Sequence, residues 1–430
     1  MSSIILLYWN LIDTIMPPRT PAAGNGDSKT LRYRQKREAI LNAATQLFDK
    51  RGFKGTMLSE VAGKVELNTN SITYYWKKKE DLFLDCQMHT INTLDLIIDR
   101  AAAGQTPAER IRRFIDAFVD MLLECHAGRY PAIMSFRDLQ DLGTSYAKVM
   151  YPAYRDMFRR ARNLVADGPL QTENKMALTV RTHLLLSQVQ WSRFWLAGFS
   201  AASYTRMAEY MCDILLNGLA EPGFVWGPNA LDEQLAAIDI PESPNHGFLA
   251  AAINLINEVG YEGASIDRIS ARLSVTKGSF YHHIPSKEEL FAECMRRTLS
   301  VVESMQNLLL QSREPGFDKL SALGRALVKF HFSPRGPLLR LSGWSTSPNY
   351  ARFLDRVEPV REFIQGVTDL FAAGMVDKSV RLTHQQVGAL MLVGMISGAT
   401  VLDKWVPGSE QTDVIDLFVR PFFEGICCAI

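Results

Sequence analysis

Apolar residues recur every three or four positions along nearly the whole chain, and no segment alternates apolar and polar residues over a sustained stretch. This spacing predicts amphipathic helices joined by short segments that contain Gly or Pro. Two segments show it clearly, with apolar stripes at Ile111, Phe114, Ile115, Phe118, Val119 and Leu122, and at Val360, Phe363, Ile364, Val367 and Leu370. The sequence therefore predicts an all-α fold.

The predicted helices fall into two halves. Residues 219–245 hold four prolines and are predicted to form a linker, because proline lacks a backbone donor and disfavours helix at the preceding residue. Across this linker the sequence repeats at an offset of 208, without a gap from Ile40 and Phe248 to Phe83 and Phe291. The chain is therefore predicted to be a tandem duplication of a unit of roughly 190 residues.

The second copy has clear helix boundaries. Gly260 suits the left-handed C-cap of a first helix, and Ser265 and Thr276 suit the N-caps of the next two. Ser286, with Glu289 three positions later, predicts a capping box at the start of a fourth helix. Two short helices joined by a tight turn and braced by a longer helix form a helix-turn-helix unit. The polar face of residues 276–283 would present hydrogen-bond donors to the major groove of DNA.

Residues 260–290, GYEGASIDRISARLSVTKGSFYHHIPSKEEL, resemble the DNA-binding signature of the TetR/AcrR family of bacterial transcriptional regulators. The resemblance covers about 45 residues in each half. It implies, for each half, a three-helix DNA-binding head followed by a helical domain that binds a ligand and dimerises through its last two helices. The chain thus resembles two fused family members.

The expected organisation follows from the linker and the repeat. It comprises a disordered N-terminal extension (1–30), a first helix-turn-helix domain (31–83), a first helical regulatory domain (84–218), the linker (219–245), a second helix-turn-helix domain (246–291) and a second helical regulatory domain (292–430). Residues 207–220 and 413–430 are expected to form a pseudo-two-fold seam between the halves. Met16 begins a polar tail, and residues 1–15 are interpreted as an upstream extension of the reading frame.

The first copy differs from the second in charge and in detail. Residues 27–81 carry twelve basic and seven acidic residues, a net charge of +5, whereas residues 245–291 carry a net charge of −1. Thr73 replaces the family tyrosine, Glu66 occupies the turn, and Lys78 stands at the position of the Ser286 cap. Since phosphate neutralisation dominates non-specific affinity for DNA, we expect the first head to supply much of the salt-dependent binding.

Specific DNA contacts are expected from both heads. In the first, Thr56, Tyr75, Lys77 and Lys79 are expected at the DNA backbone, and Thr69, Asn70, Ser71 and Tyr74 near bases. In the second, the expected residues are Ser265, Thr276, Lys277, Gly278, Ser279, Tyr281, His282 and Lys287. Lys277 is expected to contact guanine, and Gly278 to allow close approach of the backbone. Tyr281, His282 and Lys287 would lie near phosphates.

The resemblance also implies ligand cavities in the helical remainders. The expected lining residues are Tyr154, Phe158, Trp191 and Trp195 in the first half, and Phe371, Met391 and Met395 in the second. Gln190, Ser192 and Arg193 lie among these aromatic residues, so an anionic or hydrogen-bonding effector is one hypothesis. The competing interpretation is that apolar stripes at helical spacing form ordinary core.

Six scattered cysteines without a paired spacing favour a reducing cytoplasm. No membrane span, catalytic motif, cofactor or metal site is expected, since the chain lacks the corresponding motifs. Two functions remain. One is a ligand-responsive regulator, interpreted as a repressor, that binds a double-stranded operator with both heads as an intramolecular pseudo-dimer or as a dimer of chains. The other is a ligand-binding or protein-interaction module whose heads no longer bind DNA.

Overall fold

The computed structural model describes residues 27–136, 144–166, 175–240, 245–276, 278, 281, 284–340, 358–406 and 414–427. Within these residues the regular secondary structure is helical, apart from an isolated bridge between Ala220 and Val380, which confirms the all-α prediction. Residues 1–26, which include the segment interpreted as a frame extension, lie outside the described part. Helix already begins at Asp27, so residues 27–30 belong to the first head and not to an extension.

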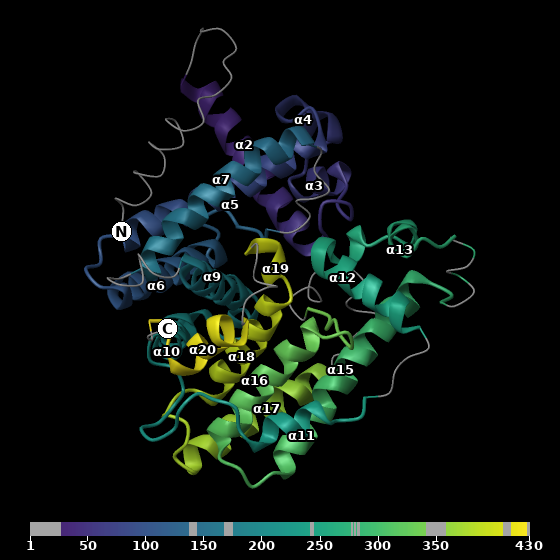
Figure 1. Cartoon of the computed structure of the whole chain (residues 1–430). Helices are drawn as coiled ribbons and strands as arrows, with labels where there is room; N and C mark the ends of the chain where they lie inside the picture. The colour runs from purple at the N-terminus through teal and green to yellow at the C-terminus, as the bar shows by residue number, and fades with distance from the viewer. Residues whose placement is uncertain are drawn as a thin grey trace.

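The first half runs from the purple to the teal helices of Figure 1. Its helices are α2 (Asp27–Arg51), α3 (Leu58–Lys64), α4 (Thr69–Tyr75), α5 (Lys79–Ala101), α6 (Pro107–His126), α7 (Thr144–Val165), α9 (Lys175–Leu196), η2 (Ala201–Ser203) and α10 (Tyr204–Asn217). Helices α2 to α4 form the first head. Helix α5 starts in the head and continues into the body, where it packs against α6 and α7.

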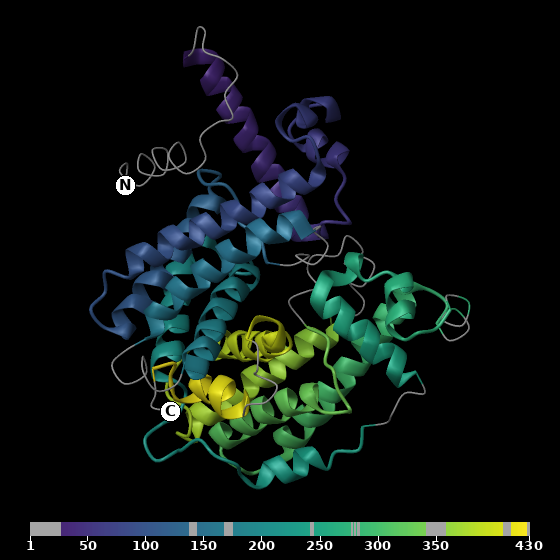
Figure 2. The same cartoon turned by 45° about the horizontal axis from the view of Figure 1, so that its top comes forward.

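The second half repeats this order in green and yellow (Figure 1). Its helices are α12 (His246–Gly263), α13 (Ile266–Arg272), α15 (Lys287–Gln311), α16 (Gly316–Phe332), α17 (Glu358–Val376), α18 (Gln385–Ala399), α19 (Leu402–Trp405), the π-helical η6 (Ile415–Val419) and α20 (Arg420–Glu424). Figure 2 shows the two heads on separate sides of a shared helical body. The second head has its own small core, whereas the first shares one continuous core with the body.

The duplication extends to backbone detail. Gly52 and Gly260 both have φ of +71°: Gly52 directly follows the end of α2, and Gly260 interrupts the helical backbone of α12 as a kink three residues before its last residue. The buried thiols of Cys86 and Cys294 contact the carbonyls of Leu41 and Leu249, again at the offset of 208.

Over its described residues, the linker is packed against the second half. It contains helix α11 (Ala230–Ala236), which packs against α16 of the second half. The guanidinium of Arg325, almost fully buried, donates to both carboxylate oxygens of Asp232 at 2.8 Å and lies 4.8 Å from the Trp226 ring. A paired and stacked buried charge fixes the geometry of the segment that carries it. The linker is therefore part of the second half's packed surface.

The two halves meet along a seam built from their last helices. Helices α9 and α10 of the first half pack against α18, η6 and α20 of the second, and the seam belongs to the continuous core. The seam predicted from residues 207–220 and 413–430 is thus present over its described residues. The sequence prediction did not include α9 and α18, which contribute much of the seam: Gln188 and Trp191 on α9 donate to the carbonyls of Met391 and Leu390.

Reciprocal glycines close the seam at its outer end. Gly218 has φ of +67°, and a Cβ there would lie 2.2 Å from the Phe423 carbonyl oxygen. Gly425 has φ of +94°, and a Cβ there would lie 2.4 Å from the Leu216 carbonyl oxygen. The backbone amides of Leu219 and Ile426 donate to Phe423 and Leu215 at 2.7 Å. Only glycine allows both the positive φ and this close approach of backbones.

Gly218→Ala is therefore expected to loosen the seam. The left-handed conformation alone costs a side chain roughly 1–2 kcal/mol, and the contact with the Phe423 carbonyl adds to it. We expect a lower thermal unfolding midpoint and faster amide exchange at Leu219 and Ile426. Gly223→Ala serves as the control, because that glycine also has positive φ but faces open space. Equal losses in both variants would show that strain, and not the seam contact, sets the effect.

Candidate functional site

The turn between α3 and α4 places the second helix of the first head. Glu66 in this turn has φ of +55°, and its counterpart Ser274 in the second head has φ of +56°. Asn68 then caps α4, since its side-chain oxygen accepts from the Ser71 amide at 2.8 Å. The two turns therefore share one backbone geometry although their sequences differ. Neither position carries the glycine that this conformation favours.

Glu66→Gly is expected to stabilise the first head. Glycine adopts positive φ without the steric cost of roughly 1 kcal/mol or more that a Cβ incurs. The change also removes an acidic side chain from the helix-turn-helix, so DNA affinity should rise at low salt. Thermal unfolding and a salt titration of DNA binding measure the two effects. Glu66→Gln separates the two effects, because it removes the charge but keeps a side chain at positive φ. If Glu66→Gln raised the unfolding midpoint as much as Glu66→Gly does, backbone strain would not be the cause of the stabilisation.

Helix α4 presents a polar, exposed face. Thr69, Asn70 and Tyr74 are exposed on it, and Lys77 and Lys78 follow directly after its end, also exposed. Ser71, predicted near bases, is half-buried, and its hydroxyl donates to the capping oxygen of Asn68 at 2.9 Å. Helix α4 and the residues after it therefore expose a surface of hydrogen-bonding and basic side chains.

The N-terminal part of α2 extends this surface. The Tyr33 ring packs against Tyr75 at 4.8 Å and meets Tyr74 edge-on at 6.2 Å. Arg32 and Lys36, one turn apart on the same helix, are exposed beside it. Burial raises the pKa of the half-buried Tyr75, so the phenol stays neutral. The aromatic contact thus joins a basic helix to the end of α4, which the charge pattern of residues 32–37 alone did not reveal.

The end of α4 is anchored by a polar contact that the second head lacks. The Trp76 indole and the Arg37 guanidinium both donate to the Asp85 carboxylate, at 2.8 and 2.6 Å, and Arg37 stacks over the indole at 4.9 Å. The equivalent positions in the second head are Ile284, Asn245 and Glu293. Isoleucine has no side-chain donor and asparagine carries no positive charge, so the second head cannot form the same charged contact. The first copy, which departs more from the family signature, is therefore firmly held in place.

Two residues of the first head, Thr56 and Lys79, were predicted to contact the DNA backbone, and for their side chains this prediction is wrong. Thr56 is fully buried, and its hydroxyl donates to the carbonyls of Leu47 and Gly52. The Lys79 ammonium donates to the carbonyls of Phe53 and Thr56 at 2.8 and 3.1 Å and lies 4.3 Å from the Phe53 ring. Burial lowers the pKa of Lys79. Both residues hold the loop before α3 in place and do not face phosphate.

The second head is described in part. Ser265 caps α13 by accepting from the Arg268 amide at 3.3 Å, and Ser286 caps α15 by accepting from Glu289, as predicted. The Glu289 carboxylate, however, lies near Arg296 at 3.6 Å. At the start of α5 the arrangement is reversed: Lys78 provides no acceptor, and its amide donates to Asp81. Each capping box thus keeps one of its two bonds.

The predicted DNA contacts of the second head stay predictions. Thr276, Gly278 and Tyr281 are exposed, and a Cβ at Gly278 would meet only the Thr276 hydroxyl oxygen at 3.9 Å. The Lys287 ammonium lies 4.3 Å from the Tyr261 ring, as Lys79 does from Phe53. Lys277, Ser279 and His282 lie outside the described residues.

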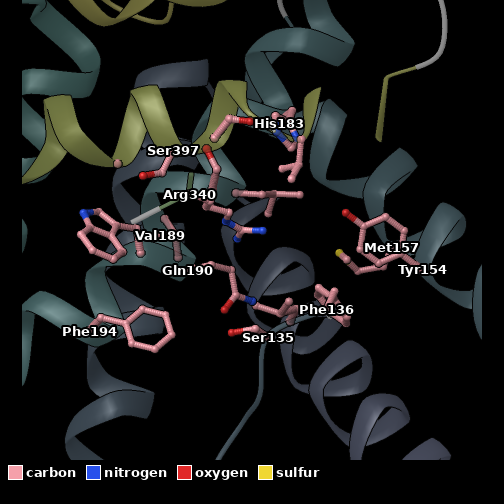
Figure 3. A pocket seen from close by; sticks show the side chains of 17 residues that line it. Ser135, Phe136, Tyr154, Met157, His183, Val189, Gln190, Phe194, Arg340 and Ser397 are labelled. Carbon is pink, nitrogen blue, oxygen red and sulfur yellow. Dashed lines mark hydrogen bonds between the residues drawn. The ribbon is translucent and has the colours of Figure 1, made fainter. Parts of the chain in front are cut away.

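A cavity of about 90 Å³ lies where the two halves meet (Figure 3). Side chains from α7 and α9 and the segment before α7 surround it from the first half, and side chains from α18 and the segment before α17 from the second. Its described lining residues are Leu94, Ser135, Phe136, Tyr154, Met157, His183, Leu186, Ser187, Val189, Gln190, Trp191, Phe194, Arg340, Gly394, Ser397, Gly398 and Val401.

This cavity contains only some of the predicted ligand residues. Tyr154 and Trp191 line it, whereas Phe158 packs beside the Tyr154 ring at 6.2 Å without reaching the cavity. Trp195 is buried against Phe199. Phe371, Met391 and Met395 are fully buried in the core and do not line this cavity. For these four, the interpretation as ordinary core holds, because each is enclosed by packed neighbours of the body.

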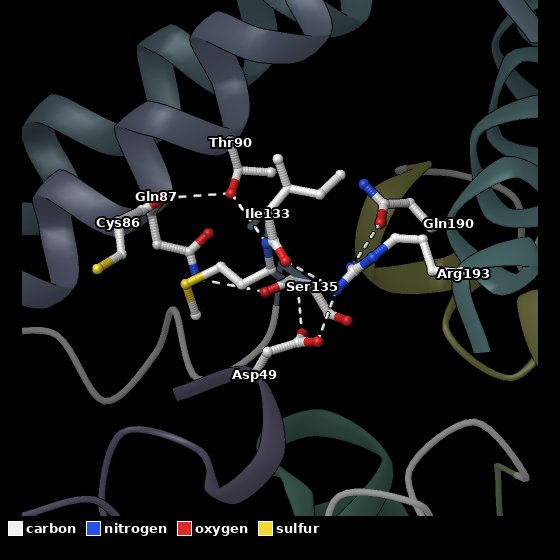
Figure 4. A network of polar contacts seen from close by, with 9 residues as sticks. Asp49, Cys86, Gln87, Thr90, Ile133, Ser135, Gln190 and Arg193 are labelled. Carbon is white, nitrogen blue, oxygen red and sulfur yellow. Dashed lines mark hydrogen bonds and ion pairs between the residues drawn. The ribbon is translucent and has the colours of Figure 1, made fainter. Parts of the chain in front are cut away.

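A polar network connects the cavity to the first head (Figure 4). Arg193 on α9 donates to Gln190 at 3.1 Å, to the Ile133 carbonyl at 2.8 Å and to Asp49 at 2.6 Å. Asp49, at the C-terminal end of α2, also accepts from the Ser135 amide at 2.7 Å. Since Gln190 and Ser135 line the cavity and Asp49 belongs to the head, a single ion pair joins the two.

The second half holds the equivalent loop without an ion pair. Asn257, the counterpart of Asp49, donates to the Leu338 carbonyl at 2.9 Å and accepts from the Arg340 amide at 2.8 Å. Thr298, the counterpart of Thr90, accepts from Leu339 as Thr90 accepts from Met134. These equivalent bonds make Arg340 the counterpart of Ser135. The same loop position thus brings a serine to the cavity from one half and an arginine from the other.

Burial perturbs the thiols of three described cysteines. Burial raises the pKa of Cys86, Cys125 and Cys294 to about 12, so these thiols stay protonated. No group of three or more His, Cys, Asp or Glu in the described ranges could hold a metal ion. Among the helices that the structure describes, none has the length and apolarity to cross a membrane.

Comparison with known proteins places both heads in one class. Residues 40–86 and 248–294 each match the bacterial regulatory proteins of the tetR family. The Transposon Tn10 TetC protein of Escherichia coli is 36% identical over 73 residues, which are 15% of this chain and 37% of that protein. The HTH-type transcriptional regulator HbdR of Aromatoleum sp. (strain CIB) is 23% identical over 148 residues, 34% of this chain and 57% of that protein.

A third relative is the biofilm operon icaADBC HTH-type negative transcriptional regulator IcaR of Staphylococcus aureus, 24% identical over 90 residues, 21% of this chain and 47% of that protein. Among solved structures, the TetR family transcriptional regulator PfmR from Thermus thermophilus is 17% identical, with a TM-score of 0.32, and covers 41% of this chain and 95% of its own. The chain spans about half the length of the curated relatives it matches.

The fold and the two sites therefore define a tandem helix-turn-helix protein with a shared helical body. Two segments of the chain, residues 40–86 and 248–294, match the tetR family of bacterial regulatory proteins, so the chain carries two DNA-binding units of that family in tandem. This confirms the family and the duplication expected from residues 260–290 and from the offset of 208.

Proposed function

We propose that this protein is a sequence-specific transcription regulator, acting as a repressor, that binds a double-stranded operator under the control of a small-molecule effector. The observation that carries the proposal is the exposed polar and basic surface formed by α4, residues 77–78 and the start of α2, on a helix-turn-helix of the tetR family. The repressor role is supported by IcaR, a negative transcriptional regulator that is 24% identical to this chain over 90 residues.

In this proposal, α4 enters the major groove. Asn70 is exposed near its N-terminal end and offers an amide that suits adenine, which accepts and donates through N7 and N6. Lys77, Lys78, Arg32 and Lys36 flank the helix and contact phosphates. The packing of Tyr33 on Tyr74 and Tyr75 holds both flanks in register with the helix.

The second head takes the second half of the operator. A helix-turn-helix dimer binds half-sites about 34–36 Å apart, and here both heads belong to one chain. The intramolecular seam, with its reciprocal glycines, takes the place of a dimer interface, and the cavity beside it takes the effector. Because the two heads differ in sequence, the two half-sites differ too.

The test selects genomic fragments with the purified full-length chain and footprints the bound sites. We expect a defined site that is bound at least about 10³-fold more tightly than random DNA of equal length at the same salt concentration. Equal affinity for selected and random DNA would contradict sequence-specific regulation and favour a ligand-binding or protein-interaction module.

A further inference from the structure

The joint between α4 and α5 of the first head carries Lys77 and Lys78, the two exposed lysines proposed to contact phosphates. Side chains of the head fix this joint on both sides. Trp76, directly before it, donates to the Asp85 carboxylate at 2.8 Å, and the ammonium of Lys79, directly after it, donates to two loop carbonyls. The two exposed lysines thus lie between two anchored residues.

Asp81, in the first turn of α5, holds the joint through both of its carboxylate oxygens. One oxygen accepts from the backbone amide of Lys78 at 3.2 Å, at the start of the helix. The other accepts from the hydroxyl of Tyr146 at 2.9 Å. This bond raises the pKa of Tyr146, so the phenol keeps its proton and remains a donor at neutral pH. Since Tyr146 belongs to α7, the bond connects the regulatory body to the joint.

Helix α7 extends from this joint to the cavity between the halves. Tyr146 and Tyr154 are eight residues apart, and Met157 follows three residues later, which puts the three side chains on one face of the helix. Helix α7 packs along α5, and Tyr154 and Met157 line the cavity (Figure 3). Farther along, Arg160 pairs with Asp95 of α5. Helix α7 therefore contacts both the cavity and the joint that carries the lysines.

The engagement of both Asp81 oxygens matters because a carboxylate beside two lysines competes with phosphate for their ammonium groups. Hydrogen bonds from an amide and a hydroxyl satisfy the carboxylate and fix its direction. Without the Tyr146 hydroxyl, one oxygen is released and can pair with a neighbouring lysine. Such a pair reduces the positive charge that the joint offers to DNA.

We propose that Tyr146 is a positioning residue for DNA binding by the first head: its hydroxyl holds the Asp81 carboxylate away from the two lysines, so that both ammonium groups contact phosphates. The inference rests on the proposed DNA-binding function and extends it from the head into the body. Because the hydroxyl comes from the helix that lines the cavity, a displacement of α7 separates Tyr146 from Asp81 and weakens the phosphate contacts. Tyr146→Phe reproduces that separation without a ligand.

The test titrates the full-length wild type and Tyr146→Phe with the selected operator and with a random duplex of equal length, at about 0.1 M salt. The variant keeps the ring and loses only the hydroxyl. We expect about fivefold weaker binding to both duplexes, because phosphate contacts do not depend on base sequence. Tyr151→Phe is the matched control, since it removes an exposed hydroxyl from the same helix and should bind as the wild type does.

Two further backgrounds separate positioning from a general loss of stability. In Lys77→Ala/Lys78→Ala the hydroxyl has no lysines to protect, and in Asp81→Ala it has no acceptor. Tyr146→Phe should cause no further loss of affinity in either background, whereas the losses would add if the hydroxyl only stabilised the fold. Urea unfolding checks that each variant is fully folded under the binding conditions.

The proposal is overturned by unchanged affinity in Tyr146→Phe, by an undiminished loss in either background, or by an equal loss in Tyr151→Phe. Failure of the proposed regulator has a different signature, which is equal affinity of the wild type for the operator and the random duplex. The effect of the hydroxyl would then persist on both duplexes. A wild type that binds neither duplex would overturn both proposals.

Discussion

Arg193→Met is expected to destabilise the first half by about 3 kcal/mol. Arg193 and Asp49 are mostly buried, and removal of one partner leaves the other charge without compensation. The variant also loses the hydrogen bonds that Arg193 donates to the Ile133 carbonyl and to the Gln190 side-chain oxygen. Urea unfolding of the full-length chain measures the change, with Arg206→Met as a matched surface control.

The second half predicts how this loss is repaired. Asn257 holds the equivalent loop alone, because an amide both donates to a carbonyl and accepts from an amide. Asp49→Asn in the Arg193→Met background should therefore recover at least about half of the lost stability, a coupling of roughly 1–2 kcal/mol. Asp49→Asn alone should destabilise, since Arg193 loses its counter-charge. A double variant as unstable as the sum of the single variants would contradict the equivalence of the two loops.

Lys77→Ala/Lys78→Ala is expected to weaken DNA binding roughly 50-fold at about 0.1 M salt. Each phosphate contact contributes about 0.9 to the slope of log affinity against log salt, so the double variant should lower that slope by about 1.8. Both side chains are exposed directly after α4. The measurement is a fluorescence titration against the selected operator at several salt concentrations.

Two control variants sharpen this prediction. Lys148→Ala removes an exposed lysine from α7 and should leave the slope unchanged. Lys79→Met should lower the stability of the first head and also leave the slope unchanged, because its ammonium is bound to the Phe53 and Thr56 carbonyls. If fully folded Lys79→Met gave a smaller salt slope than the wild type, Lys79 would have to contact a phosphate.

The local features of the fold were predictable from the sequence because their causes lie within a few residues. Gly260 breaks the helical backbone of α12 through its own conformational freedom, and Ser265 and Ser286 cap helices through amides three positions away. The repeat at an offset of 208 carried this information from one half to the other. The family followed from the same short segment.

Features that depend on distant pairs were not predictable. Lys79 is basic and stands in a run of lysines, yet a ring and two carbonyls more than twenty positions away enclose it. The apolar spacing of Phe371, Met391 and Met395 is the same as that of residues that line a cavity, so spacing alone could not show that they fill the core. The Arg193 and Asp49 pair spans 144 positions, and the equivalence of Ser135 and Arg340 appears only through the bonds of their loops.

The central claim is that two unlike heads in one chain bind the two halves of one operator. Footprinting of the selected site with wild-type protein and with Asn70→Ala tests it most directly, because Asn70 is exposed on α4 of the first head alone. We expect an asymmetric site that binds one chain, with protection weakened over one half-site in the variant. A palindromic site that binds two chains and loses protection equally on both sides would contradict the claim.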